Sequence, residues 1–123
     1  MTKTVLVAED DQDNLTIVVT ILNHFGYQTA EAMNGIRALE LIEEARPDLI
    51  ILDVSMPGLN GWEVCRRLKG NPATSDIPVI MLTAHVMAEE RRKGMECGAD
   101  EFLAKPVEPR AIVKVIEQYI GAP

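Results

Sequence analysis

Short apolar runs alternate along the whole chain with stretches in which apolar residues recur at helical spacing. The first, third and fourth runs are apolar on both faces, which is typical of strands buried inside a parallel sheet. The second and fifth runs are more polar, which is typical of strands at the edges of a sheet. The predicted strands cover residues 4–8, 27–32, 49–53, 78–82 and 100–104.

Helical spacing between these runs predicts five helices. The apolar positions of the first two are Leu15, Val18, Val19 and Leu22 before Gly26, and Ala38, Leu41, Ile42 and Ala45 before Pro47. Asn60 and Glu63 have the spacing of a capping box, which predicts the start of a third helix that ends near Gly70. Pro109 suits the first turn of the last helix. The apolar stripe of that helix is Ile112, Val115, Ile116 and Tyr119, closed by Gly121.

The fourth helix, over residues 86–97, has few apolar residues, a central Gly94 and a charged middle. We therefore expect it to be weakly packed. Five alternations of strand and helix predict an α/β fold, a doubly wound parallel sheet with helices on both faces. We expect one domain over residues 1–123, because no linker or repeat interrupts the pattern.

Composition narrows the possible functions. A net charge of -7 argues against direct nucleic-acid binding, which needs clustered Lys and Arg. No apolar run reaches membrane-spanning length, and the N-terminal residues lack the layout of a secretory signal, so we expect a cytoplasmic protein without membrane contact. Cys65 and Cys97 lie in helix-like contexts without metal-ligand spacing, which favours small buried or half-buried side chains.

Polar residues follow four of the predicted strands at their carboxyl ends. In parallel sheets of this type, ligands bind in the crevice beyond those ends. These side chains should therefore converge at one edge of the sheet. They are Glu9, Asp10 and Asp11 after the first strand, Asp53 at the end of the third, Thr83 after the fourth and Lys105 after the fifth.

Crowded carboxylates repel one another and remain ionised only when a cation lies among them. Since no histidine or cysteine cluster accompanies them, the oxygen-rich setting favours Mg²⁺. Lys105 and the Thr83 hydroxyl are suited to contact phosphoryl oxygens. The set predicts phosphoryl transfer to a carboxylate, with Asp53 as the nucleophile that forms an acyl phosphate.

Four segments, "VLVAEDD", "DLIILDVSMPGLNGWEVCRRLK", "IPVIMLTAH" and "GADEFLAKPV", resemble the receiver domain of two-component response regulators. The resemblance covers essentially the whole chain. It implies a CheY-like, flavodoxin-like fold with five helices and the strand order 2-1-3-4-5. It also implies that Asp53 accepts a phosphoryl group from a histidine kinase or a histidine phosphotransferase.

The resemblance assigns further roles at the strand ends. Glu9, Asp10 and Asp53 would hold Mg²⁺ together with the carbonyl of Ser55, and Lys105 would contact the phosphoryl group. Glu9 departs from the family pattern, where aspartate is commoner at this position.

A second set of roles concerns the output. Thr83 and Phe102 would be the switch pair, although Phe102 stands where tyrosine is frequent and could also be a simple packing aromatic. A cis peptide bond is implied before Pro106, where cis bonds are most easily formed. The surface of the fourth helix, fifth strand and fifth helix would change for a protein partner.

The resemblance also implies that the chain catalyses only its own phosphorylation and dephosphorylation. Since the chain ends at Pro123, we expect a stand-alone receiver. Whether phosphorylation promotes a dimer stays open. Two roles are open for His85: it gates water access to the phosphoryl group, or it is a plain surface histidine. Two roles are also open for Arg91, Arg92 and Lys93, which form either a solvated helix face or a site for an acidic partner. His24 is predicted at a helix end near Phe25.

Three other classes fit less well. A haloacid-dehalogenase-type phosphatase needs a second acid two residues after the nucleophile, where this chain has Ser55. A nucleotide- or flavin-binding module needs glycines in the first strand-to-helix turn, which here reads "AEDDQDN". An EF-hand loop in "DQDNLTIVVTIL" fails because Leu15 and Thr16 take positions that require a ligand and a glycine.

Overall fold

A computed structural model describes residues 3–83, 92 and 96–123 of the chain. Its sheet has five parallel strands in the order β2-β1-β3-β4-β5, which confirms the expected fold and strand order. The strands start within one residue of their predicted positions, and β4 ends one residue later than predicted, at Thr83. The strands are β1 Thr4–Ala8, β2 Gln28–Ala32, β3 Leu49–Asp53, β4 Val79–Thr83 and β5 Glu101–Ala104.

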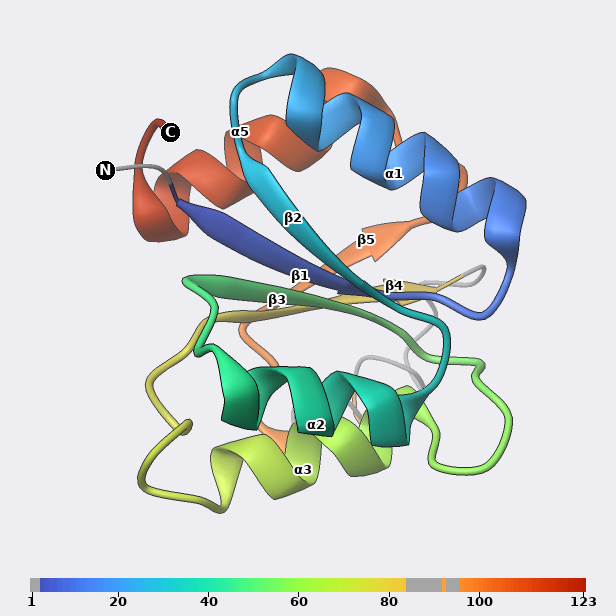
Figure 1. Cartoon of the computed structure of the whole chain (residues 1–123), viewed down its shortest axis with the longest axis vertical. Coiled ribbons are helices and arrows are strands. Elements are labelled where there is room, and N and C mark those ends of the chain that lie inside the picture. Colours follow the sequence, from blue (N-terminus) through green and yellow to red (C-terminus); the bar gives the residue numbers. More distant parts are fainter. Residues whose placement is uncertain (1–2, 84–91, 93–95) are drawn as a thin grey trace.

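Four of the five predicted helices lie within the described ranges. They are α1 Gln12–His24, α2 Gly35–Glu44, α3 Gly61–Lys69 and α5 Pro109–Ile120. The fourth predicted helix, over residues 86–97, lies mostly outside the described residues, as does His85. Helices α1 and α5 cover one face of the sheet, and α2 and α3 cover the other (Figure 1). None of the helices in the described parts has the length and apolar character needed to cross a membrane.

Side-chain caps begin all four of the described helices, and the capping residues are Asp11, Asn34, Asn60 and Glu108. Asp11 accepts a hydrogen bond from the Asn14 amide at 3.0 Å, which starts α1 directly after the first strand. Asn60 accepts one from the Glu63 amide at 3.0 Å, so the predicted cap of the third helix is confirmed. Glu108 caps α5, and Pro109 occupies its first turn as expected.

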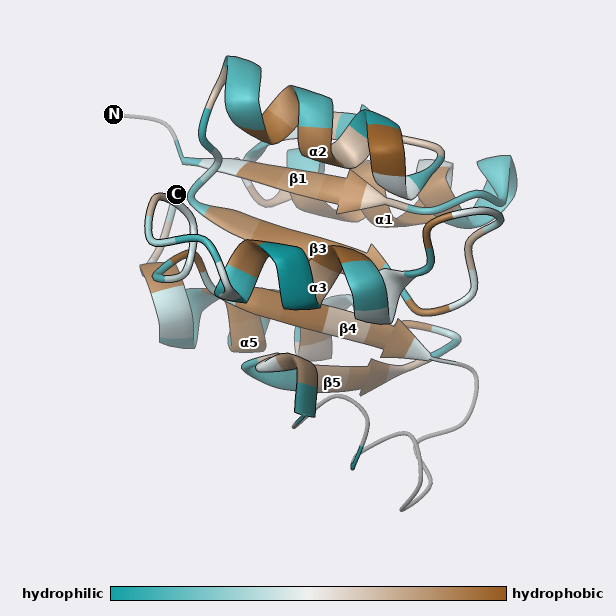
Figure 2. Ribbon diagram, turned by 90° about the horizontal axis from the view of Figure 1, so that it is seen from below, coloured by the Kyte–Doolittle hydropathy of each residue, from teal (hydrophilic) through white to brown (hydrophobic). Residues whose placement is uncertain are grey.

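The core consists of two apolar layers, one on each face of the sheet. All five residues of β3 and all five of β4 are buried, as predicted for central strands. The colouring of Figure 2 shows that β1, β3 and β4 are mostly hydrophobic along their length. Cys65 and Cys97 are both buried, which confirms their predicted character. Because the central strands are fully buried, they hold the residues at their ends in fixed positions.

Two predicted apolar positions are exposed, and Val19, Leu41 and Val115 are half-buried. Ala45 ends α2 as an exposed, extended residue. Tyr119 is 37% exposed, so its assignment to the buried stripe of the last helix is wrong. The physical reason is its hydroxyl, which donates a hydrogen bond to the Asp100 carbonyl at 2.8 Å beside β5. Ile112 and Ile116 of the same stripe are buried, as predicted.

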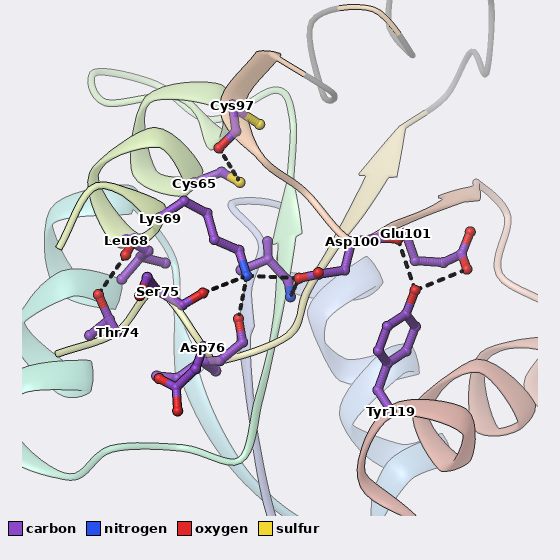
Figure 3. Close-up of polar contacts among 12 residues, drawn as sticks. Cys65, Leu68, Lys69, Thr74, Ser75, Asp76, Cys97, Asp100, Glu101 and Tyr119 are labelled. Carbon is purple, nitrogen blue, oxygen red and sulfur yellow. Dashed lines mark hydrogen bonds and ion pairs between the residues drawn. The ribbon is translucent and has the colours of Figure 1, made fainter. Parts of the chain in front are cut away.

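A lysine-centred network holds the opposite end of the sheet together (Figure 3). The Lys69 ammonium donates to the Ser75 carbonyl at 3.2 Å, to the Ile77 carbonyl at 2.8 Å and to Asp100 Oδ2 at 2.8 Å. The same Asp100 oxygen accepts the Val79 amide at 2.8 Å. The end of α3, the start of β4 and the residue before β5 are therefore joined through one largely buried cation.

Candidate functional site

The carboxyl ends of β1, β3, β4 and β5 meet at one edge of the sheet. Ala8 pairs with Leu52 across β1 and β3, so Glu9 and Asp53 are neighbours at the strand ends. Thr83 pairs with Ala104 across β4 and β5, and its carbonyl accepts the Lys105 amide at 2.8 Å. Strand register thus brings the predicted residues together, although they are far apart in sequence.

Lys105 joins two buried carboxylates. Its ammonium nitrogen lies 3.1 and 3.2 Å from the two oxygens of Glu9 and 3.0 Å from Asp53 Oδ1. The side chains of Glu9 and Asp53 are only 1% and 4% exposed, whereas that of Lys105 is 22% exposed. Since buried charges are costly unless they are paired, this contact is what permits two acids at the end of an apolar core.

Asp10 adds a third carboxylate to the same place. One oxygen each from Glu9, Asp10 and Asp53 lies within 4.8 Å of the others. Asp10 is exposed to solvent, and the other two are buried. An all-oxygen set with one side open to water matches the preference of Mg²⁺, which binds through one or two carboxylates and keeps water or phosphate oxygens. The residues present therefore fit a magnesium site.

Burial, together with the hydrogen bond and negative charge of Asp53, raises the pKa of Glu9 to about 7, because Lys105 offsets only part of these effects. Burial also tends to lower the pKa of Lys105, but the attraction of Asp53 and Glu9 outweighs it, so the pKa of Lys105 is raised. The cluster therefore has an excess of negative charge that one lysine does not neutralise. A bound cation would lower the free energy of the ionised form.

The structure places the remaining predicted residues around this cluster. Thr83 is the last residue of β4 and is 6% exposed. The Ser55 amide donates to Asp53 Oδ1 at 3.3 Å, which places Ser55 next to the proposed metal ligand. Phe102 is half-buried on β5 and packs on the apolar layer that faces α2 and α3. The Lys105–Pro106 peptide bond is cis.

Other predicted residues lie away from the cluster. His24 is the last residue of α1 and packs edge-on against Phe25, with 5.2 Å between the ring centroids, as predicted. Arg92 is exposed and forms an ion pair with Glu96 at 2.7 Å, whereas Arg91 and Lys93 lie outside the described residues.

Gly61 supports the site in a way that the sequence analysis missed. A Cβ at this position would lie 2.4 Å from the carbonyl oxygen of Asp53, so only glycine permits the start of α3 to approach the end of β3 this closely. The sequence signal is a glycine placed directly after the Asn60 cap, where most helices tolerate any residue. The backbone of Asp53 is consequently held between the sheet and α3.

The comparisons with known proteins identify the class. The profile of the response regulator receiver domain family matches residues 5–117. The phosphate regulon transcriptional regulatory protein PhoB of Pseudomonas aeruginosa is 40% identical over 111 residues, which are 90% of this chain and 48% of that protein. The polar-differentiation response regulator DivK of Brucella anthropi is 33% identical over 121 residues, 98% of each chain. The chain therefore belongs to the response regulator receiver domain family.

A solved structure resembles this chain in its fold as well as in its sequence. The receiver domain of sensor histidine kinase PA1611 from Pseudomonas aeruginosa matches with a TM-score of 0.91 at 27% identity, over 99% of this chain and 100% of that one. That structure contains a magnesium ion coordinated in its active site cleft. The chain thus spans about half the length of PhoB but nearly the whole of DivK and of this isolated receiver.

Proposed function

We propose that this chain is a phosphorylation-activated switch of a two-component system, in which Asp53 accepts a phosphoryl group from a phosphohistidine. The donor is a histidine kinase or a histidine phosphotransferase. The observation that carries the proposal is the Lys105 ammonium, which contacts both Glu9 and the nearly buried Asp53 at the carboxyl ends of adjacent strands. Neither a phosphatase acid two residues after Asp53 nor a glycine-rich phosphate loop accompanies it.

The chemistry follows from the positions of these side chains. A carboxylate oxygen of Asp53 attacks phosphorus, the bond from phosphorus to the donor's histidine nitrogen breaks, and an acyl phosphate forms. Lys105, already 3.0 Å from Asp53, donates to a phosphoryl oxygen, and Thr83 offers its hydroxyl from the end of β4. Glu9, Asp10, Asp53 and the Ser55 carbonyl would hold Mg²⁺, which supplies positive charge for the transferred oxygens.

The proposed output is a change of surface. A phosphoryl oxygen that draws in the Thr83 hydroxyl leaves room for Phe102 to turn inward, and this alters the face formed by the fourth helix, β5 and α5 for a protein target. The chain acts as one receiver domain over residues 1–123 in the cytoplasm, and it catalyses only its own phosphorylation and dephosphorylation. Sedimentation of the phosphorylated and unphosphorylated chain tests whether phosphorylation promotes a dimer.

The decisive experiment is phosphorylation by a small acyl-phosphate donor with Mg²⁺ or with chelator, read by intact-protein mass and by acid lability. The wild type should gain one phosphoryl group only with Mg²⁺, and Asp53→Asn should gain none. Asp13→Asn, which removes an exposed acid from the first turn of α1, is the matched control and should react as the wild type does. A magnesium-dependent phosphoryl group on Asp53→Asn at the wild-type rate would refute the assignment.

The same assay can find the physiological donor. Each histidine kinase of the source organism is autophosphorylated, mixed with the chain, and followed for loss of its phosphoryl group. The cognate kinase should transfer its phosphoryl group to the wild type faster than the other kinases do, and it should not transfer the group to Asp53→Asn.

A further inference from the structure

Two cysteines that are distant in sequence lie side by side. Cys65 belongs to α3, and Cys97 precedes the turn that leads to β5. Cys65 Sγ donates a hydrogen bond to the Cys97 carbonyl at 3.5 Å across a separation of 32 residues (Figure 3). Both cysteines are buried and free of disulfide bonds. The phosphoryl chemistry proposed above uses neither of them.

We propose that Cys65 and Cys97 form a redox site that a peroxide oxidises to an intramolecular disulfide and that a dithiol reductant restores. The contact supplies the main requirement, because a disulfide forms only between cysteines whose backbones already lie close together. The site is independent of Asp53 and gives the chain a second chemical input.

The two thiols differ in acidity in a manner that suits this reaction. The interaction with Cys65, the Ala99 amide and the positive charge of Arg66 together lower the pKa of Cys97 to about 7, although burial acts in the opposite direction. The hydrogen bond to Cys97 and burial raise the pKa of Cys65 well above its ordinary value. The lowered pKa favours Cys97 over Cys65 as the thiolate, which is the nucleophilic form.

Cys97 is buried between two exposed neighbours in the chain. Its side chain is buried, but Glu96 before it and Gly98 after it are both exposed. Gly98 has a φ of +90°, and a Cβ there would lie 3.0 Å from the Lys69 side chain, so the backbone turns sharply at the surface directly after Cys97.

The reaction balances with peroxide as the oxidant. The Cys97 thiolate attacks one peroxide oxygen, the O–O bond breaks, and the departing hydroxide takes a proton, which leaves Cys97 as a sulfenic acid and one water. Cys65 sulfur then attacks the Cys97 sulfur, the S–O bond breaks, and the leaving hydroxide takes the Cys65 proton as a second water. Two thiols lose two electrons and two protons, and one peroxide is reduced to two waters.

The bond would fasten α3 to the segment that enters β5. Lys69 already ties the end of α3 to Asp100 by a 2.8 Å ion pair, so the covalent link adds to a region that is held in the same arrangement. Closing a loop between distant cysteines lowers the entropy of the unfolded chain. The oxidised protein should therefore unfold at a higher temperature than the reduced protein.

The test uses folded, reduced wild-type protein treated with hydrogen peroxide, then thiol alkylation under denaturing conditions and intact mass. We expect loss of both alkylation sites, a mass lower by two hydrogens, a Cys65–Cys97 cross-linked peptide, a monomer on a nonreducing gel, and full recovery with dithiothreitol. The reduced and oxidised forms are then compared by thermal melting.

Cys65→Ser and Cys97→Ser are the matched variants. Each should keep one alkylatable or over-oxidised sulfur, form no intramolecular link and show no peroxide-induced rise in melting temperature. Two alkylatable thiols in folded wild type after peroxide, irreversible sulfinic or sulfonic acid, or only intermolecular dimers would each overturn the proposal. These readouts come from the wild type and do not involve Asp53. A negative result here therefore leaves the phosphorylation assay unaffected, and a negative phosphorylation assay leaves these readouts unaffected.

Discussion

The ammonium nitrogen of Lys105 lies 3.0 Å from Asp53 Oδ1, although the two residues end different strands of the sheet. Through its contacts with Glu9, the same nitrogen balances part of the negative charge of the acid cluster. The residue proposed to bind the phosphoryl group therefore also stabilises the unphosphorylated fold. Its removal should affect both properties, and the two can be measured separately.

Lys105→Met keeps most of the side-chain length but removes the charge. In chelator at neutral pH, we expect it to lower the free energy of unfolding by about 2 kcal/mol, because two nearly buried carboxylates lose their counter-ion. Urea unfolding measures the change. Lys114→Met, at an exposed position of α5, should change stability by less than about 0.5 kcal/mol. Equal effects of the two substitutions would contradict the bridging role.

Asp10→Asn removes the exposed carboxylate of the cluster. In chelator we expect the variant to melt at a higher temperature than the wild type, because the repulsion among the three acids is reduced. The corresponding gain in the free energy of unfolding should be no more than about 1 kcal/mol. Mg²⁺ should then raise the wild-type melting temperature more than that of the variant, since it binds the native cluster. A magnesium response of the same size in both proteins would exclude Asp10 as a ligand.

Gly61→Ala should disturb Asp53 through its backbone. The added methyl group would lie 2.4 Å from the Asp53 carbonyl oxygen, so α3 or the end of β3 must shift. We expect a loss of about 2 kcal/mol in stability and slower phosphorylation by the small donor. Gly70→Ala, at the other end of α3 with a φ of -84°, is the control and should phosphorylate at the wild-type rate.

Tyr27 should make stability depend on alkaline pH. Burial raises its pKa, assisted by the negative charge of Glu117, so the folded state keeps the phenol proton to a higher pH than the unfolded state does. The stabilisation is complete below the unfolded pKa of about 10 and is lost as pH rises through the folded value. Denaturant unfolding from pH 8 upward, with tyrosinate absorbance, measures this loss.

In Tyr27→Phe, this alkaline loss should be smaller. At neutral pH the variant should also be less stable by about 1 kcal/mol, because the hydroxyl no longer donates to the Gly121 carbonyl at 2.9 Å. Tyr119→Phe, which alters the more exposed of the chain's two tyrosines, serves as the comparison. A wild-type alkaline profile that Tyr27→Phe leaves unchanged would contradict the assignment.

Phosphorylation should change hydrogen exchange at β5. If Phe102 moves inward when Thr83 is drawn toward the phosphoryl group, amides of Glu101–Ala104 should change protection, together with the last turn of α5, where Tyr119 bonds to Asp100. Asp53→Asn treated with the same donor is the control and should show no change. Altered protection confined to α1 would be the wrong outcome for this switch.

Much of the fold could be predicted because the five apolar runs are short, separated and different in character. Runs that are apolar on both faces could only be central strands, and β3 and β4 are indeed buried throughout. The order of the strands came from the family resemblance, since hydrophobic patterning alone does not fix which strands are neighbours. Tyr119 shows the limit of patterning: helical spacing gives the face of a helix but not where a hydroxyl finds its partner.

The composition of the site was also predictable, but its contacts were not. Strand ends place Glu9, Asp53 and Lys105 at one edge, yet the bridge between them depends on side-chain conformations that sequence spacing does not determine. The pairing of Cys65 with Cys97 depends on how α3 packs against the segment before β5. The close approach of Gly61 to Asp53 is likewise a tertiary contact, visible in sequence only as an unexplained glycine.

The reactive groups lie at strand ends, whereas some exposed apolar residues lie on helices, and this separation has an evolutionary consequence. The reactive groups are fixed by buried strands, whereas Ile17 on α1 and Ile36 on α2 are 52% and 62% exposed. Substitutions on such outward positions can accumulate without altering the distances among Glu9, Asp53 and Lys105. A gene of this kind can therefore be duplicated and its copies can acquire separate partners while the reaction that each copy performs remains the same.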